Sequence, residues 1–337
     1  MLLKPFLRLL RDGRLTALMG VGAGLKSFYK LTYVAAAGEA GLLNRLATGP
    51  AGFDSLAEFF AARGQGREAL EAWLQMGVRL KLLRLDSRGY ELRGLAKDLA
   101  RPENDAALAL VEEVAGLHHK LITGTLPKIR SGQLWSLADQ DGELIARSSR
   151  VLEAFQAEAI RRTFPARGAV RLLEIGCGSG IYLRYAASSN PSLTAVGVEL
   201  QPAVAEVART NLREWRLEGR VQIEEGDIRA RAPGEPFDIA TLYNNIYYFP
   251  VEERVALLEH VGRFLKPGGF LLAITLCQGG SLGAEALNLW GAAKTGAGRL
   301  PAEEEMLSQL RQAGYRGVKT MSLLPGDRCM AFQAFRG

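Results

Sequence analysis

Three glycines at alternate positions, Gly176, Gly178 and Gly180, interrupt an otherwise apolar stretch of the chain. Glycine has no Cβ, so such a turn lets the backbone pass close beneath a bound ligand. A dinucleotide fingerprint requires the spacing G-x-G-x-x-G, and here the third glycine comes one position too early. The tighter turn suits a ligand that has no pyrophosphate.

Two acidic residues further along the chain could recognise a nucleoside. Glu199 ends the apolar run 195–200, and a carboxylate at such a strand end can accept both hydroxyls of a ribose. Asp227 follows Gly226 and is placed to accept a hydrogen bond from an adenine amino group. The spacing therefore predicts a nucleoside site with Glu199 on the sugar and Asp227 on the base.

The elements that would position these residues are parallel strands and one helix. The apolar run 170–175 has the length and composition of a buried strand, and further strands are predicted at 221–224 and 237–242. The helix expected at 181–187 would direct its N-terminal amides and dipole at a ligand above the glycine turn.

These motifs together resemble a known family. Residues 173–180, the Glu199 strand end, Gly226-Asp227 and 237–239 resemble successive motifs of class I S-adenosylmethionine-dependent methyltransferases, and 265–272 resembles the motif before their fifth strand. The resemblance implies an α/β fold with a Rossmann-like seven-stranded sheet, and S-adenosyl-L-methionine as cofactor. The cofactor-binding residues that it implies are Glu174, Gly176, Cys177, Gly178, Gly180, Glu199, Leu200, Asp227, Ile228, Tyr243 and Asn244.

The N-terminal part has the pattern of a winged helix. Helices are expected at 33–46, at 56–62 with Asp54 or Ser55 as the cap, and at 67–80. Two short strands around 87–89 follow as the wing.

The order of winged helix, helical connector and sheet resembles the plant caffeate and bacterial polyketide O-methyltransferases. That family implies a homodimer formed through the winged helix and a hydrophobic or aromatic small-molecule acceptor. The domains expected are 1–100 with an N-terminal amphipathic helix and the winged helix, a connector at 101–165, and the methyltransferase domain at 166–337. Within the connector, helices are expected at 104–130 and 143–164.

A DNA-binding regulator with a ligand-sensing methyltransferase-like domain is the alternative from another class. In such a regulator, the third helix of the winged helix (67–80) would have to be basic where it enters a groove of the DNA. That helix carries Glu68 and Glu71 beside Arg67 and Arg79, together with a broad apolar face, which indicates packing against protein. A cofactor-binding protein without transfer activity is a third hypothesis.

The general base of this family has no obvious counterpart. The family places a histidine after the fourth strand, and Tyr247 occupies that position here. An ordinary phenol has a pKa near 10 and is a poor base at neutral pH. Three routes stay open: an acceptor that is already nucleophilic, Tyr247 as acid or orienting group, or His118 or His119 supplied by the connector helix. The catalytic candidates are Tyr247 and His119, and the substrate-binding candidates are His118, Asn245, Tyr248 and Trp290.

Composition restricts the remaining classes of protein. Hydrophobic residues make up 48% and charged residues 23%, which is typical of globular domains, and the net charge of +6 is dispersed, so nucleic acid is not an expected partner. The three cysteines are far apart, so neither a metal site nor a disulfide framework is expected, and a cytoplasmic location fits.

The first thirty residues have no assigned role. Leu3, Phe6, Leu7 and Leu10 would share one face of an amphipathic helix, and the apolar run 15–25 is too short to span a bilayer. Docking on a partner subunit is favoured over a membrane surface, because the helix carries only three basic residues.

Overall fold

The computed structural model describes residues 3–337, without the side chains of Leu3, Lys4 and Phe6. The chain divides into two compact units. The first unit holds Met1–His119 and Arg147–Val151, and the second holds Lys120–Ala146 and Leu152–Gly337. None of the helices in the described part of the chain is both long and apolar enough to cross a membrane.

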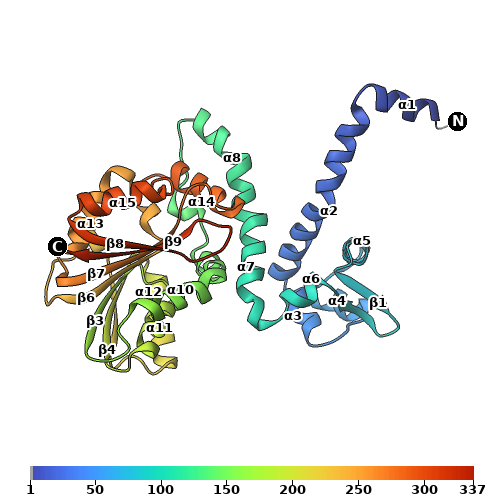
Figure 1. The fold of residues 1–337 in the computed structure, drawn as a ribbon. Coiled ribbons are helices and arrows are strands. Elements are labelled where there is room, and N and C mark those ends of the chain that lie inside the picture. The colour runs from blue at the N-terminus through green and yellow to red at the C-terminus, as the bar shows by residue number, and fades with distance from the viewer. Residues whose placement is uncertain (1–2) are drawn as a thin grey trace. The chain divides into compact units, whose positions relative to one another are not determined.

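The first unit is mainly helical and has one two-stranded hairpin (Figure 1). Its elements are α1 (Leu3–Arg11), α2 (Arg14–Glu39), α3 (Leu42–Ala47), α4 (Phe53–Phe59), α5 (Gln65–Arg79), β1 (Leu83–Asp86), β2 (Gly89–Leu92), α6 (Leu95–Leu99) and α7 (Asp105–Glu113). In its core the ring of Tyr33 stacks on Trp73, with centroids 4.5 Å apart. The hairpin pairs Leu83 with Leu92 and Asp86 with Gly89, so both predicted strands form.

Two predictions about the helices of this unit are wrong. The helix expected at 33–46 is split, because Gly41 adopts φ 77°, a left-handed conformation that only glycine takes up at little cost. Its first half is the end of α2, which extends back to Arg14 through the whole apolar run 15–25. The predicted cap at Asp54 or Ser55 is also absent, since α4 begins at Phe53 after an extended Gly52.

The connector helices are interrupted. The helix predicted at 104–130 contains a wide π-helical turn at Val114–His118, between α7 and α8 (His119–Arg130). The helix predicted at 143–164 is two helices, α9 (Gly142–Ser148) and α10 (Glu153–Thr163), joined by a 3-10 turn. Arg147 turns toward the first unit's own acids, and its Nη2 donates to Asp105 Oδ1 at 2.6 Å.

A seven-stranded sheet forms the second unit and confirms the predicted fold class. Its strands are β3 (Val170–Ile175), β4 (Leu193–Glu199), β5 (Val221–Glu225), β6 (Phe237–Tyr243), β7 (Leu265–Leu276), β8 (Tyr315–Ser322) and β9 (Cys329–Arg336). They lie in the order β5-β4-β3-β6-β7-β9-β8. The first five are parallel, and β9 is antiparallel to both of its neighbours.

Helices cover both faces of this sheet (Figure 1). They are α10 and α11 (Ile181–Ser189), α12 (Pro202–Glu214), α13 (Arg254–Gly262), α14 (Leu282–Ala293) and α15 (Glu303–Gln312). One core packs α13 and α15 on the sheet through Leu257, Leu258 and Met306. The other packs α10, α11 and α12 through Ala159, Leu183 and Leu212. Because the strand order reverses at β3, the carboxyl ends of β3, β4 and β6 form the edge where ligands of open α/β sheets bind.

Candidate active site

The glycine turn lies at the carboxyl end of β3 and leads directly into α11. Gly176, Gly178 and Gly180 have φ values of 64°, 55° and 79°, so all three need a left-handed backbone. The amides of Gly176 and Cys177 both donate to the Val198 carbonyl of β4, at 2.8 and 3.1 Å. A Cβ added at Gly178 would meet no atom within 4 Å, so the backbone there borders open space.

Glu199 organises the turn from the neighbouring strand. Its side chain is 7% exposed, Oε2 accepts from the Gly178 amide at 3.0 Å, and Oε1 accepts from the Gln201 amide at 3.0 Å. An ionised carboxylate has about four acceptor positions, so each oxygen keeps capacity for one more donor. The geometry therefore fits a ribose diol and at the same time fixes the turn beneath it.

The residues expected around an adenine follow the ends of β4 and β5. Leu200 is 55% exposed directly after Glu199, and an apolar side chain there could contact a base. Asp227 is not free, since its carboxylate accepts from both Arg229 Nε (3.1 and 3.0 Å) and Arg229 Nη2 (2.7 Å). These hydrogen bonds lower the pKa of Asp227, and they outweigh burial, which would raise it. Ile228 is buried in the core behind the turn.

A buried acidic cluster lies beneath the glycine turn. Glu174 is fully buried, its Oε2 has no hydrogen-bond partner, and burial raises the pKa of this carboxyl well above its usual value. The rings of Tyr182 and Tyr243 lie 5.2 Å apart, and burial followed by the charge of nearby acids raises the pKa of both phenols. A cationic group bound beside Glu174 would favour the charged form of this carboxyl.

The asparagines after β6 join that strand to the turn. Asn244 has φ 51°, and its Oδ1 is buried without a partner. The Asn245 side-chain amide donates to the Ile175 carbonyl at the end of β3, and its Oδ1 is likewise buried without a partner. A Cβ on Gly176 would lie 2.5 Å from Asn245 Nδ2, so the glycine is required for this contact.

The aromatic candidates form a wall beside this edge. Tyr247 is buried in the core, and its carbonyl accepts from the Gly298 amide at 3.0 Å. The Tyr248 ring lies 5.0 Å from the Tyr247 ring, and its hydroxyl accepts from Gln140 Nε2 at 3.2 Å. Trp290 on α14 is buried, with its Nε1 unpartnered.

The two histidine candidates do not belong to the second unit, which forms this edge. His118 and His119 belong to the first unit, where His118 Nε2 lies 3.1 Å from Glu113 Oε1 and the His119 ring lies 6.4 Å from that of Phe28. Cys177 is buried, which raises its thiol pKa well above the usual value and favours a packing role. No cluster of His, Cys, Asp and Glu in the described residues could hold a metal ion.

The sequence reasoning missed several residues at this edge. Tyr182 and Arg229 are brought there only by the fold, and Lys294 is brought beside Tyr248. Tyr182 had a weak signal, since it stands on the first turn of the helix that follows the glycines. Arg229 and Lys294 had no signal in the sequence.

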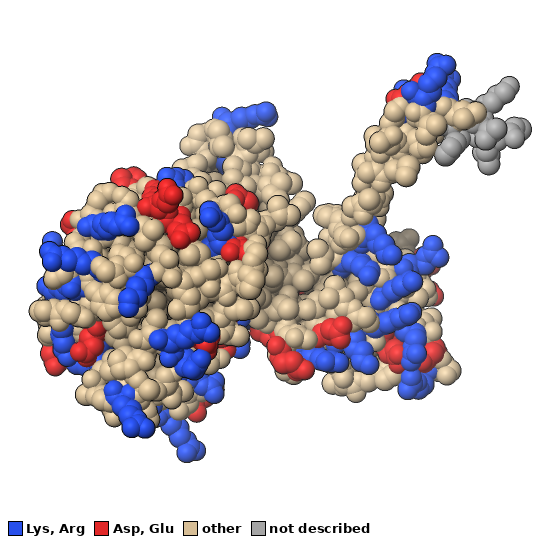
Figure 2. Space-filling view, in the orientation of Figure 1, with Lys and Arg blue, Asp and Glu red and all other residues tan. Residues whose placement is uncertain are grey.

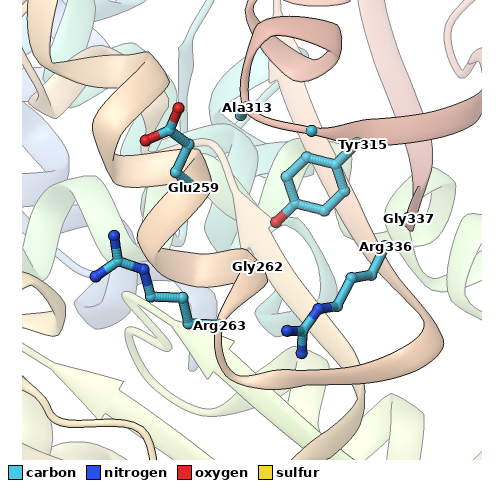
Figure 3. A pocket seen from close by; sticks show the side chains of 8 residues that line it. Glu259, Gly262, Arg263, Ala313, Tyr315, Arg336 and Gly337 are labelled. Carbon is cyan, nitrogen blue, oxygen red and sulfur yellow. The ribbon is translucent and has the colours of Figure 1, made fainter.

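A separate shallow groove lies at the opposite edge of the sheet. Figure 3 shows Glu259, Arg263 and Arg336 arranged around the Tyr315 ring, between α13 and the ends of β8 and β9. β9 is antiparallel to β7 and pairs Phe335 with Phe270, so this groove lies near the start of β7. It is distinct from the candidate site.

Comparison with known proteins defines the class of the second unit. Residues 173–271 match the sequence family described as "Methyltransferase domain", which confirms the resemblance found in the sequence motifs. The matched residues run from β3 into β7 of the sheet.

Among curated relatives, the demethylspheroidene O-methyltransferase of Rhodobacter capsulatus is 29% identical over 246 residues, covering 72% of this chain and 58% of that protein. The cypemycin N-terminal methyltransferase of a Streptomyces species is 32% identical over 100 residues, covering 29% of this chain and 38% of that protein. The matches thus span less than two thirds of these relatives.

Solved structures share the fold over almost the whole chain. The mitomycin 7-O-methyltransferase MmcR has a TM-score of 0.80 at 20% identity, covering 97% of this chain and 100% of its own. Human N-acetylserotonin methyltransferase in complex with SAM has a TM-score of 0.74 at 18% identity, with coverage of 95% and 98%. A third structure is NcsB1 from neocarzinostatin biosynthesis, in complex with S-adenosyl-L-homocysteine and 1,4-dihydroxy-2-naphthoic acid. It has a TM-score of 0.69 at 19% identity, covering 92% of this chain and 96% of its own.

Proposed function

We propose that this chain is an S-adenosylmethionine-dependent methyltransferase that acts on a hydrophobic or aromatic small molecule. The observation that carries the proposal is the buried Glu199 carboxylate, which holds the Gly178 amide and keeps acceptor capacity beside open space. When bound, S-adenosylmethionine supplies the methyl group. O-methylation is the default from the relatives, and transfer to nitrogen or carbon stays open because Tyr247 replaces the usual histidine.

The residues of the candidate site have separate roles in this proposal. Glu199 binds the ribose, and Leu200 and Asp227 border the adenine. The glycine turn carries the chain beneath the ligand, and Glu174 complements the cationic part of the cofactor. Asn245, Tyr248 and Trp290 form the acceptor side, with Tyr247 supporting it from the core.

The test is a calorimetric titration of the purified chain with S-adenosylhomocysteine, with NAD as the control ligand. We expect S-adenosylhomocysteine to bind and NAD not to bind, because the glycine spacing leaves no place for a pyrophosphate. Binding of NAD alone, or of neither ligand, would contradict the proposal.

Charge argues against the alternative of a DNA-binding regulator. On the hairpin, Arg84 pairs with Glu91 and Arg88 pairs with Asp86. Glu68 and Glu71 are exposed on α5. Figure 2 shows acidic and basic residues interspersed on the visible face, and on α5 the exposed Arg79 is accompanied by the exposed acids Glu68 and Glu71.

A homodimer formed through the first unit is part of the proposal. Large apolar side chains on α2 are exposed, including Leu18, Met19, Val21, Leu25 and Phe28. An apolar surface of this extent marks an interaction site, and a second copy of the chain is the partner implied by the resemblance. We expect sedimentation equilibrium to give twice the chain mass for the wild type and the single chain mass for Leu25→Asp/Phe28→Asp. A monomeric wild type would contradict the dimer.

His118 and His119 remain substrate-side and catalytic candidates, as proposals from the resemblance. A cytoplasmic location is also part of the proposal, because Cys177, Cys277 and Cys329 are all free thiols, as expected in a reducing compartment.

A further inference from the structure

Lys294 is a buried lysine on the turn that follows α14. Its residue exposure is 8%, although lysines are almost never fully buried unless paired. The backbone on either side is fixed, since the Trp135 amide donates to the Ala293 carbonyl at 2.9 Å and the Thr295 amide donates to the Trp135 carbonyl at 2.9 Å. The position of Lys294 is therefore set by a parallel bridge between two segments of the second unit.

The ammonium group of Lys294 has few partners. Nζ lies 3.5 Å from the Thr295 carbonyl oxygen, a long contact, and 5.5 Å from the centroid of the Tyr248 ring. Within the described part of the chain, no carboxylate forms an ion pair with it. Burial without a counter-ion disfavours the charged form, and burial lowers the pKa of this lysine from its ordinary value.

The Tyr248 ring and the Trp135 segment lie beside Lys294. Tyr248 is the titratable side chain on the segment after β6, and Gln140 binds its hydroxyl. On the other side, the Trp135 ring is covered by a second cation, with Lys128 Nζ 4.5 Å from its centroid.

Contacts within the second unit connect Lys294 to the candidate site. The Asn245 amide touches the end of β3, and two residues further on the Tyr247 carbonyl accepts from the Gly298 amide of the turn that carries Lys294. Tyr248 then places its ring beside the Lys294 ammonium. Lys294 thus lies beside Tyr248, on a segment that the Gly298 amide joins to Tyr247.

We propose that Lys294 receives the proton of the acceptor's hydroxyl group, in place of the missing histidine. This inference rests on the proposed function. The Lys294 Nζ lone pair takes the hydroxyl proton, and the acceptor oxygen uses the freed electron pair to bond the methyl carbon. The carbon–sulfur bond breaks with its electrons going to sulfur, which yields S-adenosylhomocysteine. The resulting ammonium stabilises the oxyanion until transfer and later returns its proton to water.

The first test follows the titration of Lys294 and needs no acceptor. The full chain is labelled biosynthetically with lysine carrying carbon-13 at Cε, and the Lys294 signal is identified by its loss in Lys294→Arg. With S-adenosylhomocysteine bound, we expect the Lys294 signal to titrate at least about one pH unit below the other lysines. Titration together with the other lysines would overturn the inference.

The second test measures transfer from S-adenosylmethionine to 1,4-dihydroxy-2-naphthoic acid as a probe phenol. We expect Lys294→Met and Lys294→Arg each to lower kcat about 100-fold with little change in KM, because arginine keeps the charge but cannot accept a proton. Lys128→Met is the matched control and keeps the wild-type kcat. Full activity of Lys294→Arg would overturn the inference, whereas absence of S-adenosylhomocysteine binding by the wild type would overturn the proposed function instead.

Discussion

Glu199→Ala is expected to weaken the binding of S-adenosylhomocysteine at least tenfold, or by about 1.4 kcal/mol. The substitution removes the ribose acceptor. It also leaves the amides of Gly178 and Gln201 without their partner, so the turn is held to the neighbouring strand by the amides of Gly176 and Cys177 without that of Gly178. Both effects reduce affinity, and calorimetric titration measures their sum.

The control for this variant is Glu218→Ala. Glu218 is an exposed acid in the turn before β5, and replacing it with alanine changes the net charge by the same amount as Glu199→Ala. We expect wild-type affinity for this control. Unpaired buried amides destabilise a protein by about 1–3 kcal/mol each. The thermal midpoint of Glu199→Ala is therefore measured first, and the titration is done at a temperature at which the variant is folded. Undiminished affinity in a folded Glu199→Ala variant would remove the ribose assignment.

Gly178→Ala is expected to keep the fold and to lose most of the cofactor affinity. The residue has φ 55°, so alanine costs about 1–2 kcal/mol of stability, but its methyl group would meet no protein atom within 4 Å. The methyl group would instead fill the open space where we place the ligand. We expect affinity for S-adenosylhomocysteine to fall more than tenfold in calorimetry (about 1.4 kcal/mol).

Gly168→Ala separates backbone strain from ligand contact. Gly168 has φ 87°, and a Cβ there also meets nothing within 4 Å, but it precedes β3 and so lies near the opposite edge of the sheet. We expect Gly168→Ala to lose a comparable amount of stability and to keep the wild-type affinity for S-adenosylhomocysteine. Equal affinities for the two variants would show that the space above Gly178 is not the ligand site.

The sheet could be predicted from sequence because its signals are local. Four of the six residues in the run 170–175 are apolar, which is typical of a strand covered on both faces, and the run forms β3 over those residues. Glu199 could be predicted because the end of a strand and a short carboxylate leave little freedom of placement. Individual strands of the second unit were therefore predicted from apolar runs and strand ends, whereas the seven-stranded arrangement was implied by the resemblance to class I methyltransferases.

Other features depend on contacts between distant segments and leave no local pattern. Arg229 binds Asp227 because a 3-10 turn folds it back, and nothing in the sequence distinguishes this arginine from a solvated one. Lys294 is buried only because Trp135 bridges its turn, across a separation of more than 150 residues. The break at Gly41 was missed because a single glycine is also tolerated inside helices.

Gln156 had a signal that the sequence reasoning did not use. It stands between Phe155 and Ala159 in the apolar stripe of α10, and it is fully buried with neither side-chain polar atom partnered. A lone amide in an apolar stripe is a pattern that could have been noted from sequence.

The most direct test of the central claim is a crystal structure of the full chain with S-adenosylhomocysteine. The account predicts adenosine above the turn formed by Gly176, Gly178 and Gly180, with both ribose hydroxyls donating to the Glu199 carboxylate. Clear density for the nucleoside elsewhere, or a turn covered by the protein's own side chains at saturating ligand, would contradict it.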